Sequence, residues 1–479
     1  MRPSAGCRAV IGAMAAAVAL VPAAAAAHGT GGREDRRHDV VRAALAPGAI
    51  SHIFVVELEN EGADTTFGSG SPATYLNGTL LKQGELVSNY YATGHASLDN
   101  YIAQISGQAP TLETGADCGV QAQGTSIVGS YDDLLPGTLD PDQSLYPGQV
   151  DGHGCIYPAT VPTIASQLDA QYPPDGRTHR AAWRDYAQDM GNQPSGRELG
   201  DVDPTGGLDC AHPARGGVDN TNSASSATAT APADQYATRH NGFVYFHSIL
   251  DRTAECDANV VPLGQIQVGT PSRLDGVTLP DTFTGHLADD LRRISTTPRF
   301  GWISPNLCND GHDSTCAGPN TIGEIGAGAG GLHGADEFLA HWIPLLQASP
   351  AYRSGSMLIV VTFDEAGSGD ATACCGETPG PDNPTPGFSS LLAPIYLQYG
   401  LPIPDPAPGG GRVGAVLLAP RFITAGSVDS TGYYNHYSAL RSYEDLLGLT
   451  RGGQDGLGHL GFAAASELAP FGRDVFNRR

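Results

Sequence analysis

The stretch "AISHIFVVELEN" (49–60) is a short aliphatic and aromatic run that ends in polar and acidic residues. An apolar run of this length is typical of a strand buried on both faces, as in a parallel sheet. "SMLIVVTFDE" (356–365) repeats the pattern much later in the chain. Because ligands of parallel sheets bind beyond the carboxyl ends of the strands, we expect one site to contain the polar residues that end these two runs, namely Glu59, Asn60, Asp364 and Glu365.

The rest of the chain alternates between strand-like and helix-like patterns. We predict strands within 243–250, 298–306 and 413–422, and helices within 161–172, 335–349 and 436–449. This alternation favours an α/β fold in which a central, mostly parallel β-sheet is flanked by helices. The 63 glycines and 35 prolines predict long loops. We expect a single domain over 48–475, with a loop-rich insertion at about 187–240 that contains "TNSASSATATAPAD".

The N-terminal residues 1–27 have the pattern of a secretory signal. Arg2 and Arg8 form a positive region before an apolar run, and small residues up to Ala27 form a cleavage site. The apolar run is shorter than the ~20 residues that span a bilayer. We therefore expect a secreted protein, cleaved near Ala27, with a flexible leader at 28–47 and no stable membrane anchor.

The chain is strongly acidic, with a formal charge of −24 that becomes −26 if Arg2 and Arg8 are removed with the signal. Such a surface repels nucleic acid and anionic membranes, so we expect no nucleic-acid partner. The cysteines beyond the signal are even in number, which in an exported protein predicts disulfides. Cys308 and Cys316 could close a local loop. As another interpretation of these cysteines, a cysteine-ligated zinc site is disfavoured because no CxxC pair occurs.

Two acidic strand ends together favour a metal site. Neighbouring carboxylates repel each other unless a cation or hydrogen bonds compensate them, and a lone Asp-Glu pair would simply start a solvated loop. Oxygen ligands from two strand ends suit a hard divalent cation, so we predict Mg, Ca or Mn, with Zn as the alternative. The predicted ligands are Glu59, Asn60, Asp364 and Glu365.

Ser97 stands at the start of a predicted helix in "NYYATGHASLDNYIAQISG" (89–107). Two interpretations are open: a helix N-cap, or a nucleophile whose hydroxyl is activated by a nearby metal ion. Asn100, one turn on, could donate to a phosphoryl oxygen or merely belong to the first turn. We assign Asn100 and His95 as candidate substrate-binding residues.

Two further histidines are candidates for chemistry. "SPNLCNDGHDSTC" (304–316) places Asp310 and His312 in a loop that follows a predicted strand, and His436 opens the predicted helix at 436–449. Either histidine could bind a second metal ion, contact phosphate or protonate a leaving alkoxide, and the alternative is an ordinary loop histidine. The chain has no GxSxG elbow, so a serine triad of that kind is not supported.

The order of these segments resembles the bacterial phosphoesterase family of phospholipases C and acid phosphatases, within the alkaline phosphatase superfamily. The matching segments lie between about 50 and 450: "IFVVELEN", "NYYATGHASLDNYIAQISGQAPT", "FGWISPNLCNDGHD", "LIVVTFDE", "GAVLLAPRFITAGSV" and "YNHYSALRSYEDLLGL". The resemblance implies an alkaline-phosphatase-like sandwich and a covalent phosphoenzyme on Ser97. It also implies metal ligation by the strand-end residues and Asp310, with His312 and His436 at superfamily histidine positions.

The chain departs from the family pattern at several positions. Ala96 and Asp99 stand where the family's serine motif has prolines, and Asp364-Glu365 replaces an Asp-His pair common in the superfamily. The second departure favours hard cations over zinc.

The expected function is a metal-dependent phosphoric-ester hydrolase that resembles acid phosphatases and acts on small-molecule or lipid-derived phosphoesters. A phospholipase C is the first alternative, although no basic or amphipathic membrane element is evident. A non-catalytic exported binding protein on the same fold is the second. The cysteine-centred sulfatase signature is absent. The sequence does not show whether monoesters or diesters are the substrates, or what the oligomeric state is.

Overall fold

The computed structural model describes residues 42–119, 129–173, 181–190, 201–202, 209–219, 235–312, 330–367, 369–375, 379–388 and 409–478. The predicted signal, most of the predicted leader, and much of the predicted insertion lie outside these ranges. Among the described residues, no helix has the length and apolar character needed to cross a membrane.

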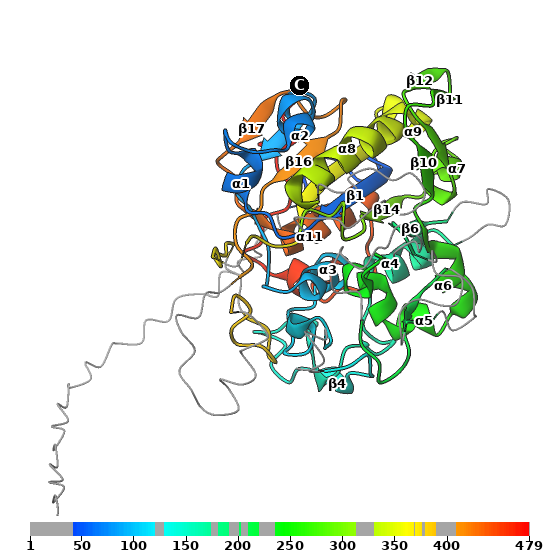
Figure 1. Ribbon diagram of the computed structural model, residues 1–479. Coiled ribbons are helices and arrows are strands. Elements are labelled where there is room, and N and C mark those ends of the chain that lie inside the picture. Colours follow the sequence, from blue (N-terminus) through cyan, green and yellow to red (C-terminus); the bar gives the residue numbers. More distant parts are fainter. Residues whose placement is uncertain are drawn as a thin grey trace, which may run out of the picture. The chain divides into compact units, whose positions relative to one another are not determined.

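An eight-stranded sheet forms the centre of the described chain (Figure 1). Its strands, in spatial order, are β17 (Ser427–Asp429), β2 (Glu85–Val87), β16 (Ala415–Leu418), β15 (Met357–Phe363), β1 (His52–Leu58), β14 (Phe300–Ser304), β6 (Trp183–Ala187) and β9 (Val260–Pro262). The run from β15 to β9 is parallel, whereas β16 is antiparallel to both of its neighbours. Every residue of β1 and β15 is buried, as their apolar runs predict.

Helices cover both sides of this sheet. Figure 1 shows α8 (Gly331–Ala348) on one side of the central strands and α3 (Ser97–Ser106) with α11 (His436–Leu447) on the other. The other α-helices are α1 (Ala63–Phe67), α2 (Thr74–Gly78), α4 (Ile164–Gln171), α5 (His247–Leu250), α6 (Thr253–Asn259), α7 (His286–Asp290) and α9 (Pro350–Arg353). The predicted α/β architecture is therefore confirmed.

Shorter elements connect these layers. The 3-10 helices are η1 (Leu80–Lys82), η2 (Thr114–Ala116), η4 (Thr238–His240), η5 (Gly242–Tyr245) and η6 (Gly461–Ala464). Two-stranded pairs form between β3 (Tyr90–Tyr91) and β18 (Tyr434–Asn435), β4 (Leu135–Leu139) and β5 (Val150–His153), β7 (Asp201–Val202) and β8 (His212–Pro213), β10 (Gln265–Gln267) and β13 (Thr282–Thr284), and β11 (Ser272–Leu274) and β12 (Val277–Leu279). The β3–β18 pair places the segment before Ser97 beside the start of α11.

The predicted strand at 243–250 is wrong. The segment forms η5 and α5 instead, and the Asn241 side chain caps η5 by accepting a hydrogen bond from Phe243 N. Its aromatic residues are buried, and Phe243 stacks on Trp183 with ring centroids 5.0 Å apart. A buried apolar run of this length fits a helix as well as a strand, so periodicity alone could not separate the two.

Disulfides are present, as the cysteine count predicts. They join Cys118 to Cys155, Cys210 to Cys256, and the sequence neighbours Cys374 and Cys375. Cys308 is also disulfide-bonded. Its predicted partner, Cys316, lies outside the described residues.

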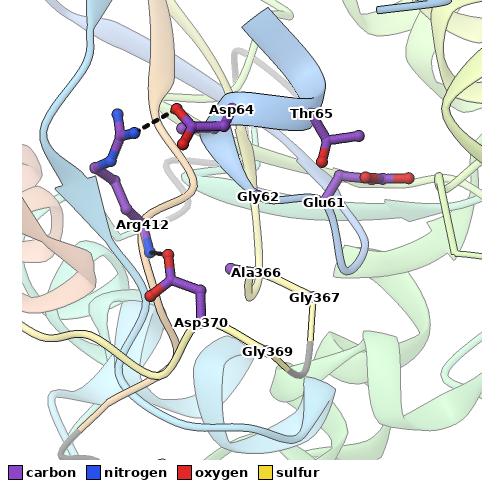
Figure 2. A pocket seen from close by; sticks show the side chains of 10 residues that line it. Glu61, Gly62, Asp64, Thr65, Ala366, Gly367, Gly369, Asp370 and Arg412 are labelled. Atoms are coloured by element: carbon purple, nitrogen blue, oxygen red, sulfur yellow. Dashed lines mark hydrogen bonds and ion pairs between the residues drawn. The ribbon is translucent and has the colours of Figure 1, made fainter. Parts of the chain in front are cut away.

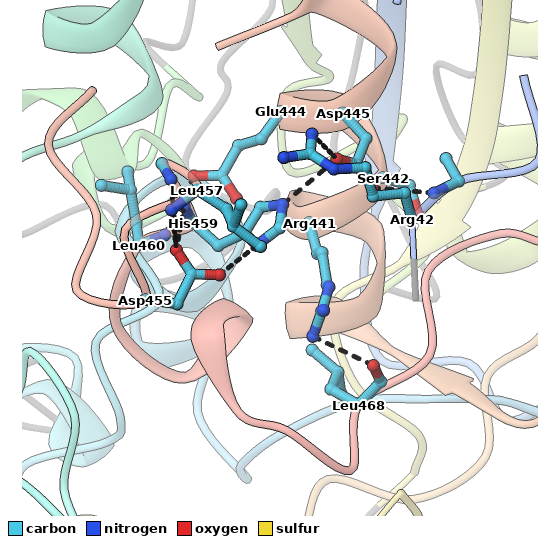
Figure 3. A network of polar contacts seen from close by, with 12 residues as sticks. Arg42, Arg441, Ser442, Glu444, Asp445, Asp455, Leu457, His459, Leu460 and Leu468 are labelled. Atoms are coloured by element: carbon cyan, nitrogen blue, oxygen red, sulfur yellow. Dashed lines mark hydrogen bonds and ion pairs between the residues drawn. The ribbon is translucent and has the colours of Figure 1, made fainter. Parts of the chain in front are cut away.

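A buried polar network anchors α11 to the chain that follows it (Figure 3). His459 Nε2 lies 3.2 Å from Asp445 Oδ1, and His459 Nδ1 lies 2.6 Å from Asp455 Oδ2. Asp445 also accepts a hydrogen bond from Arg42 at the other end of the described chain. The network therefore ties Arg42, from the start of the described chain, and the segment at 455–459 to the helix that begins with His436.

Candidate active site

Three carboxylates meet at the carboxyl ends of β15, β1 and β14. Leu58 pairs with Phe363 in the sheet, so the next residues, Glu59 and Asp364, leave adjacent strands at the same level. The loop after β14 brings in Asp310, whose carbonyl accepts a hydrogen bond from Glu59 N (2.8 Å). All three side chains are buried. The structure therefore places Glu59, Asp364 and Asp310 together.

Asn60 turns the chain sharply after β1. Its φ of 53° lies in the left-handed region, which asparagine tolerates better than most residues. This conformation lets Asn60 N donate to Asp364 Oδ1 (2.8 Å). Among the described residues, neither Asn60 Oδ1 nor Asp364 Oδ2 has a hydrogen-bond partner, although both atoms are buried.

Glu59 accepts hydrogen bonds from two residues of one helix. Ser97 Oγ donates to Glu59 Oε2 (2.8 Å), and Tyr101 Oη donates to Glu59 Oε1 (2.6 Å). Ser97 and Tyr101 are four residues apart in α3, so both side chains lie on one face of the helix. This pair of hydrogen bonds connects the predicted nucleophile directly to the carboxylate cluster.

Ser97 is the first residue of α3, and Ala96 is the N-cap, with no side-chain cap hydrogen bond within the described chain. The interpretation of Ser97 as a helix cap is therefore wrong, because its hydroxyl points to Glu59. The serine nevertheless lies at the helix N-terminus, where the dipole of α3 favours negative charge.

Asn100 holds the segment before Ser97 in place. Its Oδ1 accepts from Thr93 N, Thr93 Oγ1 and Gly94 N, and its Nδ2 donates to Gly94 O and Ala96 O (2.9 Å each). Both amide hydrogens are thus already donated to main-chain carbonyls. In the structure, Asn100 therefore positions the main chain before Ser97, and neither hydrogen of its Nδ2 is free to bind a substrate.

The pKa values of the clustered carboxyls lie above their ordinary range. Burial is the main cause of the raised pKa of Glu59, followed by repulsion from Asp364 and Asp310. Burial likewise raises the pKa of Asp364 to about 6, although the contact with the Glu59 side chain and the hydrogen bonds from the main-chain N of Asn60 and of Glu365 lower it. Excess negative charge is therefore costly here, and a positive charge placed among these groups would stabilise them.

Glu365 faces His95 and is buried. His95 Nδ1 lies 2.8 Å from Glu365 Oε2, and His95 Nε2 lies 3.0 Å from the carbonyl oxygen of Asp370. A carbonyl can only accept, so Nε2 carries hydrogen, and the Nδ1–Oε2 contact then needs a second proton on either partner. Burial lowers the pKa of His95 and, with repulsion from Asp364, raises that of Glu365. The two predicted site residues form one pair that orients the loop after β15.

His312 lies at the exposed rim of the cluster. Its main-chain N donates to Asp310 Oδ1 (2.9 Å). Its charge also acts on the carboxyls of Asp364 and Glu365, lowering their pKa values. An exposed imidazole within electrostatic reach of the carboxylates is suited to exchange protons with a leaving group.

His436 is buried behind the cluster. Its Nε2 lies 2.7 Å from the carbonyl oxygen of Asp364, and its Nδ1 lies 3.1 Å from the hydroxyl of Tyr90. Burial lowers its pKa to about 4, so the ring is neutral near pH 7. With both nitrogens engaged, His436 positions Asp364 rather than facing a substrate.

Three residues of the site were not identified from the sequence: Tyr101, Arg239 and His240. His240 stacks on Tyr101 with ring centroids 5.7 Å apart, and its Nε2 lies 3.5 Å from Glu59 Oε1. Arg239 is a buried cation whose Nη1 donates to Asp219 (3.0 Å). Tyr101 could have been found from its spacing to Ser97. His240 and Arg239 end a segment that we assigned to the insertion, and no sequence pattern marks them.

The donor atoms of the cluster fit a hard divalent cation in part. The two buried oxygens without described partners, Asn60 Oδ1 and Asp364 Oδ2, are of the type that such ions prefer. Glu59 is close to them, but both of its oxygens already accept hydrogen bonds. No group of three or more His, Cys, Asp or Glu side chains is arranged to hold a metal ion within the described ranges.

No protein-family model matches the chain, and no curated protein matches it. Solved structures that align with it include a protein in the alkaline phosphatase superfamily from Vibrio parahaemolyticus (11% identity, TM-score 0.38, covering 85% of this chain and 69% of that one). The sulfatase PsFucS1 from Pseudoalteromonas sp. aligns at 14% identity and a TM-score of 0.39, covering 84% and 68%.

The lipoteichoic acid synthase LtaP from Listeria monocytogenes aligns at 10% identity and a TM-score of 0.39, covering 87% of this chain and 78% of that one. At these identities and TM-scores, the alignments do not indicate which reaction this chain performs. A function must therefore be argued from the residues of the site.

Proposed function

We propose that the chain is a secreted, metal-dependent hydrolase of phosphoric esters, with Ser97 as the nucleophile. The hydrogen bond from Ser97 Oγ to Glu59 Oε2 (2.8 Å) is the observation that carries this proposal. It joins a serine at a helix N-terminus to a buried carboxylate, and that combination suits attack on an anionic ester. The motif order that resembles phosphoesterases supports the same chemistry.

In the first step, Ser97 Oγ attacks phosphorus and the bond to the leaving alcohol breaks. Glu59 Oε2 already accepts the serine hydrogen, so it is placed to receive the proton as the new P–O bond forms. His312, at the exposed rim, protonates the departing alkoxide. In the second step, His312 takes a proton from water as the water oxygen attacks the phosphoserine, the bond between phosphorus and Ser97 Oγ breaks, and Glu59 returns its proton to Ser97.

A divalent cation would be held by Asp364 and Asn60, with Glu59 close by, and would supply positive charge to the phosphate and to the serine oxygen. Tyr101 and His436 do not contact the ester. Tyr101 holds Glu59 from the other side, and His436 holds the main chain of Asp364.

Phosphomonoesters are the favoured substrates. The formal net charge of −24 opposes binding to an anionic lipid surface, which argues against a phospholipase C as the first choice. Phospholipase C activity therefore stays the second candidate, supported by the resemblance of the motifs.

The proposal is tested with the purified full chain, p-nitrophenyl phosphate, its phosphodiester analogue and phosphatidylcholine micelles. We expect hydrolysis of the monoester to be fastest, and Ser97→Ala to lower kcat by about 10³-fold or more, as loss of a nucleophile does. We also expect exhaustive chelation to abolish turnover and added Mg²⁺, Ca²⁺ or Mn²⁺ to restore it.

Ser106→Ala is the matched control. Ser106 lies in the same helix and is also buried, but its hydroxyl donates to the Ile102 carbonyl (2.7 Å). This variant should keep near-wild-type turnover. Near-wild-type turnover of Ser97→Ala would contradict the nucleophile assignment, and full activity after chelation would contradict the metal dependence.

A further inference from the structure

A polar cavity of about 460 Å³ is lined by residues that follow the acidic ends of β1 and β15 (Figure 2). Its walls come from the segments that continue from the two acidic strand ends, with Glu61 and Gly62 after β1 and Ala366 and Gly367 after β15. These segments touch, since a Cβ atom added at Gly62 would lie 3.6 Å from Cβ of Ala366. The cavity is therefore two or three residues along the chain from Glu59 and Asp364.

Charged groups of both signs line this cavity. Arg412 donates from Nη2 to Asp64 Oδ1 (2.6 Å), and its main-chain N donates to Asp370 Oδ2 (3.2 Å), as Figure 2 shows. The Asp64 side chain is 94% exposed, so water or a ligand hydroxyl can replace it on the guanidinium. Glu61 adds a third carboxyl, whose pKa is raised by burial.

The remaining lining residues are small. Among the described residues that line the cavity, none has an aliphatic side chain larger than alanine. An alkyl chain placed there would remove water from the charged groups without replacing the hydrogen bonds that water makes to them, which is costly. An anionic group would meet three carboxyls and one guanidinium, so charge opposes it as well.

We propose that this cavity binds the alcohol portion of the substrate and that this alcohol is a neutral polyol or sugar. A hydroxyl group both donates and accepts, so it can satisfy carboxylates and a guanidinium in the same space. The volume lies within the ~300–1,000 Å³ typical of small-molecule sites. This assignment rests on the proposed function for its place in catalysis, but the binding itself can be measured without turnover.

The test compares binding of free glucose, 1-octanol and choline to the full chain by calorimetry or ligand-observed NMR. We expect glucose to bind at least about tenfold more tightly than either comparator. 1-Octanol and choline have fewer hydroxyl groups than glucose, so polar groups of the cavity would stay unpaired when either of them binds. If choline bound more tightly than glucose, the cavity would prefer a cationic alcohol. If 1-octanol bound more tightly than glucose, the cavity would prefer an apolar alcohol. Either result would overturn the proposal.

Gly369→Trp blocks the cavity, and Gly70→Trp is its control. A Cβ atom at either glycine would have no heavy atom of the described residues within 4 Å, so both variants start in open space, but only Gly369 of the two lines the cavity. We expect Gly369→Trp to weaken glucose binding by about tenfold or more and Gly70→Trp to leave it within about twofold. Equal glucose affinity in the two folded variants would overturn the cavity assignment.

Turnover separates this proposal from the proposed function. Gly369→Trp should lower kcat/KM for glucose 1-phosphate more than for methyl phosphate, because the methyl group does not fill the cavity. A wild-type chain that binds glucose but hydrolyses neither ester would contradict the proposed function and support the cavity assignment. The opposite result is hydrolysis of both esters by the wild-type chain, with the same glucose affinity in the wild type and in Gly369→Trp. This result would support the proposed function and contradict the cavity assignment.

Discussion

Glu59 is the residue on which the site depends most. It is buried, repelled by two other carboxyls, and held by one hydroxyl on each oxygen. An unpaired buried acceptor costs about 1–3 kcal/mol, so the two hydroxyl donors are needed to keep Glu59 in place. Ser97 therefore orients the same carboxylate that is proposed to receive its proton.

Tyr101→Phe tests this interdependence. Loss of one hydrogen bond to Glu59 should lower kcat about tenfold with little change in KM, because about 1.4 kcal/mol of positioning is lost from a group outside the substrate contact. Steady-state kinetics on p-nitrophenyl phosphate measure the effect. Tyr443→Phe is the control, since the buried Tyr443 hydroxyl has no hydrogen-bond partner among the described residues. Equal activity of the two variants would contradict the role of Tyr101.

At the residue scale, the sequence predicts which side chains meet at the strand ends, but it does not predict the hydrogen-bond partners of the residues around them. Glu59, Asp364 and Asp310 could be placed because parallel strands end at one edge. The hydrogen-bond partners of Asn100, His95 and His436 could not, since they depend on main-chain carbonyls brought close by loops far apart in sequence.

Among the elements, α3 sets the position of the Ser97 hydroxyl relative to Glu59, because Ser97 is its first residue. The helix is held at its start by Asp117 Oδ1, which accepts from Leu98 N (3.0 Å), and by Asn100, which clamps the preceding segment. Gly94 has no room for a side chain, because a Cβ atom there would lie 2.5 Å from Asp99 Oδ2. Ser97, the proposed nucleophile, thus lies at a helix start that is held by hydrogen bonds to Asp117 and Asn100.

Asn100→Ala should loosen this start. We expect the free energy of unfolding to fall by about 2–4 kcal/mol and kcat to fall more than KM rises, because several main-chain groups lose their partner and Ser97 shifts. Denaturant unfolding and kinetics measure both. Asn77→Ala removes a comparable clamp away from the site, where Nδ2 bonds Thr66 O and Ala73 O, and should cost stability without lowering kcat. A rise in KM for Asn100→Ala at unchanged stability would instead indicate direct substrate contact.

The elements that could be predicted are those with a long, uniform pattern. β1, β15, α8 and α11 were placed within a few residues, because each carries a continuous apolar run or a helical repeat. The segment at 243–250 failed because its burial comes from tertiary packing around Trp183. The end of the predicted insertion supplies Arg239 and His240, which only the folded chain brings to Glu59.

Over the whole molecule, the network around His459 joins residues 42–43, α11 and the segment at 455–459 (Figure 3). Burial alone would lower the pKa of His459, but the carboxylates Asp445 and Asp455 raise it to about 9. Because this folded-state pKa is above the ordinary value of 6.5, the network stabilises the fold fully below about pH 6.5. That stabilisation is lost as the pH rises through about 9.

His459→Gln should therefore lower the free energy of unfolding by about 2 kcal/mol at pH 6, and the difference from wild type should shrink between pH 6.5 and 9. Urea unfolding at several pH values measures this difference. His333→Gln is the control, because its side chain is 56% exposed and its contact with Glu337 is long (3.9 Å). A difference that grows with pH would contradict stabilisation by the protonated His459 ring.

In the described part of the acidic chain, Ser97 donates to Glu59, a buried carboxylate that is repelled by Asp364 and Asp310. Trapping the covalent intermediate tests that central claim most directly. The full chain is mixed with p-nitrophenyl phosphate and divalent cation, quenched in acid within the first turnover, and analysed by intact mass and peptide mapping. We predict one phosphoryl group on Ser97 in the wild type and in Ser106→Ala, and none in Ser97→Ala. Turnover with no phosphoryl group on Ser97, or with one on another residue, would contradict the assignment of Ser97 as the nucleophile.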